Sequence, residues 1–182
     1  MEVVIAPERE LPAGLRAQVL ALHRETWGDV SGHDPVLAPL SMVLLDGGRV
    51  VAALDILTKE LTHGDEHYRA SGLSTVVTDP ARRHEGIGLS LLLGAYERMS
   101  TSGVDLALFT CDEPLAPFYE RAGFEVLAGT QVIGGTPAEP FPSGPLGKVT
   151  LAAFFTPHAQ THRPDFSSAD VELYPGTIDR LW

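Results

Sequence analysis

The feature that most constrains this chain is a strand that leads through a glycine-containing turn into an amphipathic helix. The strand is predicted over residues 68–78. After the turn, a helix predicted over residues 86–99 carries one apolar stripe, made of Leu89, Leu92, Leu93, Tyr96 and Met99. The start of a helix has unpaired N–H groups and a positive end, and Gly86 and Gly88 leave its backbone uncovered. The turn over residues 83–88 is therefore predicted to bind an anion.

The other elements predict one α/β (α+β) domain over residues 1–182. Two apolar runs flank Asp46-Gly47-Gly48, which favours a hairpin because these residues tolerate positive φ. Strands are predicted over residues 2–6, 42–46, 50–58, 104–110, 124–135 and 148–155, and helices over 14–24 and 114–121. The rest is predicted as a helix–loop region over 28–41, a loop over 136–147, and a polar, acidic tail over 156–182 that folds back on the domain.

Composition limits the class of partner. The formal net charge is −11 and the sequence pI is about 4.9. Neutralising phosphates needs clustered Lys and Arg, so no nucleic acid or anionic membrane is expected as a partner, and a cationic small molecule suits the chain better. No segment resembles an export signal or approaches the ~18 apolar residues of a membrane span, so a cytoplasmic location is expected. Cys111 is the only cysteine, which excludes an internal disulfide and a cysteine-based zinc cluster, and no metal is expected.

The turn reads Arg83-His84-Glu85-Gly86-Ile87-Gly88, with Pro80 before it. It resembles the Arg/Gln-x-x-Gly-x-Gly/Ala signature of the GNAT acetyltransferases. This resemblance implies a GNAT fold, with a central mixed, mostly antiparallel sheet flanked by helices, and acetyl-CoA as co-substrate. It further implies that the main chain of Arg83 to Gly88 holds the coenzyme A pyrophosphate and that the main chain around Val76, Val77 and Thr78 meets pantetheine. Glu85 departs from what a phosphate site favours, and its side chain is expected to point to solvent.

Acyl transfer to an amine needs an acid that protonates the leaving thiolate, and a phenol can supply it. Tyr119 lies in Pro117-Phe-Tyr-Glu-Arg-Ala-Gly-Phe124, which resembles the family's F/L-Y-x-x-x-G-F motif. The alternative for Tyr119 is a core residue whose hydroxyl bonds a backbone carbonyl. Thr110 and Cys111 end the preceding strand and are expected near the acetyl group or the acceptor. Cys111 is interpreted as small buried filler, because no His lies nearby in sequence and direct transfer needs no nucleophile.

Over most of its length the chain also resembles the aminoglycoside 2′-N-acetyltransferases. Gly28 to Asp34 keeps that group's two acids five residues apart, and residues 174–182 resemble its ending with an acid and a tryptophan. The resemblance implies that Asp29, Asp34, Asp179 and the Trp182 carboxylate contact the ammonium groups of an aminoglycoside. The alternative for each acid is a helix N-cap or a solvated surface position. A homodimer is possible.

The chain departs from this subfamily at two places, which concern the acceptor and the catalytic base. The subfamily's glutamate on the strand before the turn aligns with Ser74, and its acidic stretch becomes Ser143-Gly-Pro-Leu-Gly-Lys148. Ser74 is not a strong base. Water, the terminal carboxylate or a relay to His33 is therefore expected to replace the glutamate at this catalytic position. For His33 itself, a surface position is the simpler expectation. A different amine, such as a polyamine or a peptide N-terminus, or a silent domain that only binds its ligand, stays an alternative.

Overall fold

The computed structural model describes residues 1–28, 30 and 32–173. Its strands are β1 (Glu2–Pro7), β2 (Leu40–Asp46), β3 (Arg49–His63), β4 (Glu66–Thr78), β5 (Leu106–Asp112), β6 (Glu125–Val126), β7 (Gln131–Gly135), β8 (Pro140–Pro142), β9 (Lys148–Phe154) and β10 (Asp170–Glu172). Its α-helices are α1 (Ala13–Trp27), α2 (Ile87–Ser100), α3 (Ala116–Glu120) and α4 (Pro157–Thr161). Short 3-10 helices are η1 (Glu8–Glu10), η2 (Pro35–Leu37), η3 (Pro80–Arg82), η4 (Glu113–Leu115), η5 (Gly144–Leu146) and η6 (Arg163–Phe166).

The main sheet has the strand order β1-β2-β3-β4-β5-β9-β6. Neighbouring strands are antiparallel except for β4 and β5, which run parallel. The predicted mixed, mostly antiparallel sheet flanked by helices is thereby confirmed. The turn at Asp46-Gly47-Gly48 joins β2 to β3, as predicted, with positive φ at both glycines.

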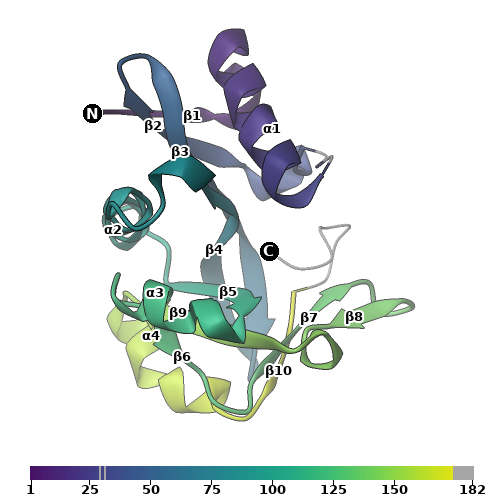
Figure 1. Cartoon of the computed structure of the whole chain (residues 1–182). Helices are drawn as coiled ribbons and strands as arrows, with labels where there is room; N and C mark the ends of the chain where they lie inside the picture. The colour runs from purple at the N-terminus through teal and green to yellow at the C-terminus, as the bar shows by residue number, and fades with distance from the viewer. Residues whose placement is uncertain (29, 31, 174–182) are drawn as a thin grey trace.

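Helices α1 and α2 cover opposite faces of this sheet (Figure 1). Successive side chains of a strand point to opposite faces, and β2 follows this rule. Met42 and Leu44 pack in the cluster under α2, whereas Val43 and Leu45 pack in the cluster that contains residues of α1. All four are at most 7% exposed. Burial of a large aliphatic side chain stabilises the fold by roughly 1.5–3 kcal/mol, so these two stripes fix both helices on the sheet.

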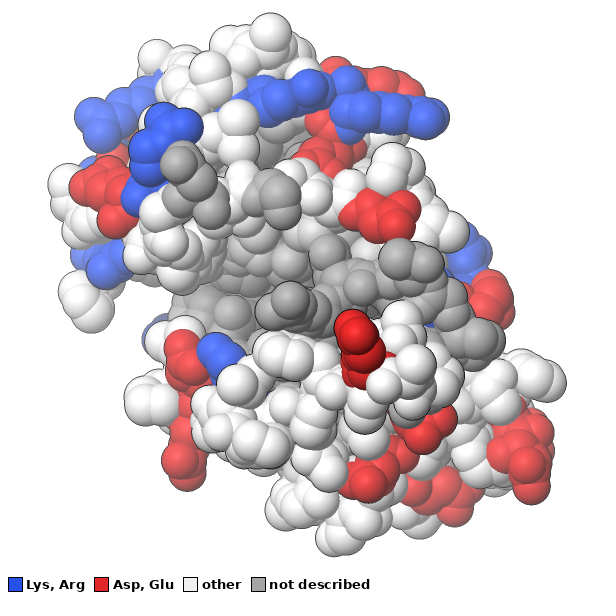
Figure 2. All heavy atoms as spheres, turned by 90° about the vertical axis from the view of Figure 1, so that its right-hand side faces the viewer, with Lys and Arg blue, Asp and Glu red and all other residues white. Residues whose placement is uncertain are grey.

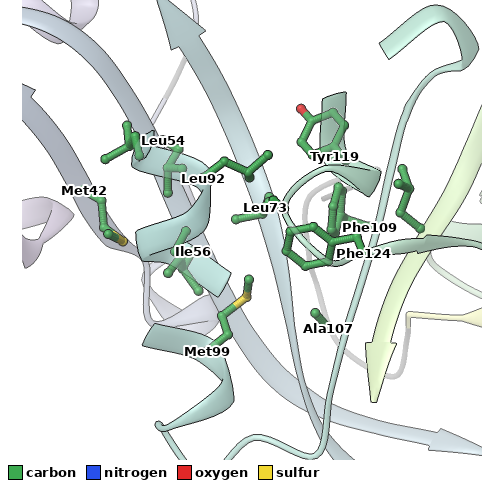
Figure 3. Close-up of a cluster of buried hydrophobic side chains, with 14 of the residues drawn as sticks. Met42, Leu54, Ile56, Leu73, Leu92, Met99, Ala107, Phe109, Tyr119 and Phe124 are labelled. Atoms are coloured by element: carbon green, nitrogen blue, oxygen red, sulfur yellow. The ribbon is translucent and has the colours of Figure 1, made fainter. Parts of the chain in front are cut away.

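Figure 3 shows how the cluster under α2 reaches across β4 to β5 and α3. Leu92 and Met99 of α2 lie beside the strand residues Ile56 and Leu73. The aromatic part of the same cluster is formed by Phe109, Tyr119 and Phe124. The helix, the parallel pair of strands and α3 therefore form one packed unit around the turn at residues 83–88.

The C-terminal half contains a second sheet that the sequence analysis did not predict. Its order is β10-β7-β8, with β10 parallel and β8 antiparallel to β7. The segment 136–147, predicted as a loop, contributes β8 and η5. Residues 156–173, the described part of the predicted tail, carry Phe166, Val171 and Leu173 into a buried cluster with β3, β5 and β9, so this segment belongs to the core.

Candidate active site

Strands β4 and β5 diverge after a short stretch of pairing. In the described chain the paired residues are Ala70 with Leu106 and Ser71 with Ala107. From residue 72 to residue 78, the edge of β4 that faces β5 therefore has no strand partner among the described residues. An unpaired edge offers N–H and C=O groups to an extended ligand that adds itself like a strand.

A cavity of about 710 Å³ opens beside this edge. Its walls come from the end of α1 at Thr26 and Trp27, from β4 at residues 76–78, from the turn and the start of α2 between Arg82 and Leu89, and from residues 115–121 around α3. Figure 2 shows the molecule hollowed across the middle of one face, with Lys and Arg mixed with Asp and Glu on the part above the hollow and mostly Asp and Glu below it. Val76, Val77, Thr78 and the turn residues thus share one cavity.

The turn before α2 presents an uncapped helix start. Gly86 is the N-cap residue, with φ of 80°, and no side chain caps the helix. The N–H groups of Ile87, Gly88 and Leu89 therefore lack the side-chain acceptor that an N-cap usually provides. They lie at the positive end of a 14-residue helix, which favours an anion. The predicted strand, turn and helix are all present, with the helix beginning at Ile87.

Packing also requires the absence of a side chain at Gly88. A Cβ on Gly88 would lie 2.6 Å from Thr78 Oγ1 and 3.5 Å from a ring carbon of Phe118. The missing side chain thus lets α2 approach the end of β4 and α3. Gly86, in contrast, has no atom within 4 Å of its added Cβ, so its requirement is the positive φ.

Glu85, the acidic residue of the turn, is neutralised by Arg82. Glu85 Oε2 accepts a hydrogen bond from Arg82 Nε at 2.7 Å, and Arg82 also pairs with Asp46 at 3.0 Å. The bonds to Glu85 and then to Asp46 raise the pKa of Arg82 above its ordinary value. The Glu85 side chain is 46% exposed and directed at Arg82. Arg83 and His84 are exposed and pair with no other described side chain, so Arg83 is the cation available to an anion here.

Tyr119 lies on α3 with its ring packed and its hydroxyl at the cavity. The ring contacts Phe109 and Phe118 edge-on, with centroids 5.2 and 5.1 Å away. Figure 3 shows the hydroxyl directed away from Phe109 and Phe124. No described residue hydrogen-bonds this hydroxyl, whereas a purely structural tyrosine is expected to bond a carbonyl. Burial raises the pKa of Tyr119 well above its ordinary value of 10, so the phenol stays protonated and able to donate.

Cys111 is buried at the end of β5 and is unsuited to nucleophilic work. Burial raises the pKa of its thiol to about 11. The thiol donates weakly to the carbonyl of Asp112, with 3.3 Å between Sγ and O. Thiolate is the reactive form, so little of it exists at neutral pH. Thr110 precedes Cys111 and pairs with Thr150 of β9, and neither Thr110 nor Cys111 lines the 710 Å³ cavity.

The structure places His33 in the interior rather than at the surface, so the surface expectation for this residue is wrong. Its side chain is 7% exposed, and a hydrogen bond of 2.8 Å links its Nε2 to Ser74 Oγ. Its Nδ1 lies 3.4 Å from Glu8 Oε2 and 3.9 Å from Asp55 Oδ2, without a well-aligned bond to either. Two carboxylates thus lie beside the ring nitrogen that does not bond Ser74.

Asp55 organises the strand around Ser74. Its carboxylate accepts hydrogen bonds from Ser41 Oγ and, at 2.6 Å, from Thr75 Oγ1. Thr75 has φ of 50°, which is costly for a β-branched residue. The strain coincides with a register shift between β3 and β4, where Ala53 pairs with Val77 but Asp55 pairs with Ser74. The bulge bends β4 at Thr75. Ser74, which contacts His33, lies before the bend, and residues 76–78, which line the larger cavity, lie after it.

A second cavity, of about 600 Å³, opens beside His33. Its lining includes Glu8 of η1, Arg16 of α1 and His33. Asp34, the next residue, lines neither cavity and instead caps η2, accepting from Val36 N at 2.9 Å. Asp34 is therefore in a structural role that the sequence analysis held as the alternative.

Asp29, Asp179 and Trp182, the other residues assigned to the acceptor, lie outside the described residues. Trp27, which is 50% exposed and lines the larger cavity, was not predicted as a site residue, and neither were Glu8 and Asp55. His23 of α1 is buried, and burial is the chief cause of its lowered pKa. In the sequence, the one signal for Trp27 as a site residue is its position directly before Gly28.

Known proteins support the fold. The sequence model of the family described as acetyltransferase (GNAT) domain matches residues 9–127. No curated protein matches the chain. The crystal structure of Escherichia coli ElaA matches at 17% identity with a TM-score of 0.60, covering 83% of this chain and 97% of that one. An acyl-CoA N-acyltransferase from Pseudomonas aeruginosa matches at 17% identity and a TM-score of 0.59 over the same shares.

The ribosomal-protein-S18-alanine N-acetyltransferase of Escherichia coli matches at 14% identity and a TM-score of 0.55, covering 85% of this chain and 95% of that one. At such identities the likeness concerns the fold alone, and none of these three proteins is described as acting on an aminoglycoside. Within residues 1–28, 30 and 32–173, no helix has the length and apolar character needed to cross a bilayer.

Proposed function

Because the chain belongs to the GNAT acetyltransferase domain family, and is thus an acyl-CoA-dependent N-acetyltransferase, we propose that it moves the acetyl group of acetyl-CoA directly to a primary amine. The observation that carries this proposal is the larger cavity. It joins an unpaired strand edge, an uncapped helix start and a protonated phenol in one space. These are the three groups that an extended thioester with a pyrophosphate requires.

The proposed cofactor position follows from those groups. The pyrophosphate lies at the N-terminus of α2, against the amides from Arg83 to Gly88, with Arg83 as the nearby cation. The pantetheine arm adds to the edge of β4 along Val76, Val77 and Thr78. This direction carries the thioester away from the turn, towards the bulge at Thr75 and the hydroxyl of Tyr119.

The proposed reaction is one acyl transfer in a ternary complex. The amine nitrogen attacks the thioester carbon, a C–N bond forms, and the C–S bond breaks. The leaving sulfur takes the proton of the Tyr119 hydroxyl, and the phenolate regains a proton from solvent. The attacking nitrogen loses one proton, so the products are an N-acetylated amine and free coenzyme A thiol.

Ser74 and His33 are proposed to carry the proton that the amine loses. Ser74 precedes Val76, which lines the cofactor cavity, by two residues, while His33 lines the second cavity. The 2.8 Å bond between Ser74 Oγ and His33 Nε2 gives a path from one side to the other. The carboxylates of Glu8 and Asp55 lie beside Nδ1 of the same ring, at 3.4 and 3.9 Å. A serine at this position thus works with a base that lies far away in sequence.

The proposed acceptor is an amine of an aminoglycoside-like amino sugar, with a polyamine or a peptide N-terminus as the competing class. This part rests on the sequence resemblance and on the net charge of −11, which suits a polycationic substrate. Asp34 gives the least support to this acceptor, because its carboxylate caps η2.

The test is an assay of thiol release from acetyl-CoA with matched panels of aminoglycosides, polyamines and peptides with free N-termini. The highest kcat/KM is expected for an aminoglycoside, and mass spectrometry should find one added acetyl group on its amine. If a polyamine or peptide has the higher kcat/KM, the acceptor class is wrong and the transfer chemistry stands. If no amine accelerates thiol release while coenzyme A binds in calorimetry, the transfer itself is contradicted.

A further inference from the structure

Three metal-ligating side chains meet at the end of the molecule that carries α4, outside both cavities. Glu66 begins β4, and His158 and His162 lie on α4 and at its C-cap. One ligand atom from each lies within 4.8 Å of the other two. Glu66 Oε2 is 3.7 Å from His158 Nε2, and Glu66 Oε1 is 3.9 Å from His162 Nε2.

Local structure explains why the two histidines point the same way. Residues four apart on a helix share a face, and the N–H of His162 donates to the carbonyl of His158. Thr156 caps this turn through its hydroxyl, which accepts from Ala159 N. The ring of His158 also stacks on the buried Tyr68, with centroids 5.0 Å apart. Both imidazoles are thus held by the fold around them.

The outer contacts are those that orient a histidine ligand. Asp165 Oδ2 lies 3.1 Å from His162 Nδ1, which leaves Nε2 of the same ring facing Glu66. The backbone carbonyl of Asp165 bonds to His63 Nε2 at 2.9 Å, so Asp165 is itself fixed to the β3–β4 hairpin. A carboxylate on the second nitrogen of a metal-bound histidine sets its tautomer and strengthens the ligand.

We propose that Glu66, His158 and His162 bind one divalent ion of the zinc class, with water at the remaining position. Two imidazoles and a carboxylate suit Zn²⁺, and Co²⁺ or Ni²⁺ are expected to substitute. Ligand atoms of tetrahedral zinc lie about 3.3 Å apart, so the three side chains need to close by small rotations. Their exposure of 31–41% leaves room for this movement and gives the ion a path from solvent.

The proposed ion is structural. None of its three ligands lines either cavity, so it does not reach the acyl-transfer chemistry. It ties the β3–β4 hairpin to the segment of α4 and η6, which covers the cluster around Phe166. A ligand that binds only the folded chain stabilises that chain, so added zinc is expected to raise the Tm.

The test uses the full chain without a histidine tag, stripped with a chelator and dialysed. Calorimetric titration with Zn²⁺ should give one site per chain, and His158→Ala, His162→Ala and Glu66→Gln should each weaken it at least about a hundredfold, as loss of one of three ligands implies. The matched control is His67→Ala, because His67 is exposed, adjoins Glu66 and bonds only Thr62 among described side chains. Asp165→Asn should weaken binding about tenfold to a hundredfold.

Co²⁺ supplies a second readout, since tetrahedral Co²⁺ has visible absorption that an ion on scattered surface groups lacks. Coenzyme A binding, measured on every variant, reports whether it is folded. The proposal is overturned if the stripped protein binds no more Zn²⁺ than the His158→Ala/His162→Ala variant, or if His67→Ala loses as much affinity as the ligand variants.

Discussion

The imidazole of His33 lies against the hydroxyl of Ser74, with 2.8 Å between Nε2 and Oγ. His33 comes from the loop after α1, and Ser74 from β4, just before the bulge that precedes the residues lining the larger cavity. The contact places the imidazole of His33 next to the hydroxyl of Ser74, which is not a base by itself. Any part that Ser74 takes in proton transfer therefore depends on His33.

The first prediction is that His33→Gln lowers kcat about a hundredfold, the lower end of what general base catalysis contributes. Steady-state rates with one acceptor, measured for the wild type and the variant, check this.

His67→Gln is the control for that series, because this histidine is exposed on the same strand as Ser74. Ser74→Ala should have a smaller effect, since a water molecule can take the place of the hydroxyl. An unchanged kcat in His33→Gln would remove His33 from the proton path.

Tyr119→Phe should lower kcat by roughly tenfold to a thousandfold, because it removes the proton donor and keeps the ring that packs on Phe109. Coenzyme A affinity and Tm should change little. Burial raises the pKa of Tyr119 above 10, so its ionisation should cause no loss of activity as pH rises from 7 towards 10. Pre-steady-state measurement of acetyl transfer isolates the chemical step, and undiminished transfer in the Phe variant would contradict the role.

Cys111→Ala is expected to keep most of the wild-type kcat, because direct transfer uses no thiol nucleophile. The pKa of about 11 also predicts slow alkylation of native Cys111 at pH 7–8. The rate should climb with pH, since each rise towards the pKa increases the thiolate fraction. Mass spectrometry of iodoacetamide-treated native protein follows this, with denatured protein as the reference. Rapid labelling at neutral pH that abolishes turnover would overturn this interpretation.

Gly88→Ala should destabilise the fold by about 1–3 kcal/mol, the usual range for overpacking, because its Cβ meets Thr78 Oγ1 at 2.6 Å. Denaturant unfolding measures the change. The double variant Thr78→Ala/Gly88→Ala should recover much of it, since the clashing atom is gone. Gly86→Ala should instead cost about 1–2 kcal/mol through its positive φ, with no recovery from Thr78→Ala.

Asp34 allows its two possible roles to be separated. Asn caps a helix as well as Asp does, whereas Ala does not, so Asp34→Ala should cost about 1 kcal/mol and Asp34→Asn little. If the carboxylate also pairs with an ammonium of the acceptor, Asp34→Asn should raise the acceptor KM without changing stability. Equal KM values for wild type and Asp34→Asn would leave Asp34 as a cap alone.

Much of the architecture followed from local signals. The apolar stripe of α2, the Asp46-Gly47-Gly48 turn and the glycines at residues 86 and 88 each depend on neighbours in sequence, and each was placed within a few residues. The β8 strand and η5 were missed, because Pro140, Pro142 and Gly144 are typical of loops and form regular structure only against β7.

The sequence by itself determined the glycine turn before α2, the place of Tyr119 in its motif and the family, because each of these depends on residues that lie together in the chain. Tertiary structure alone decided that His33 is buried behind Ser74, that Asp34 caps η2, and that Glu66 meets His158 and His162. Each of these depends on side chains from separate elements, whose distances and burial are set only when the sheet, α1 and α4 pack together.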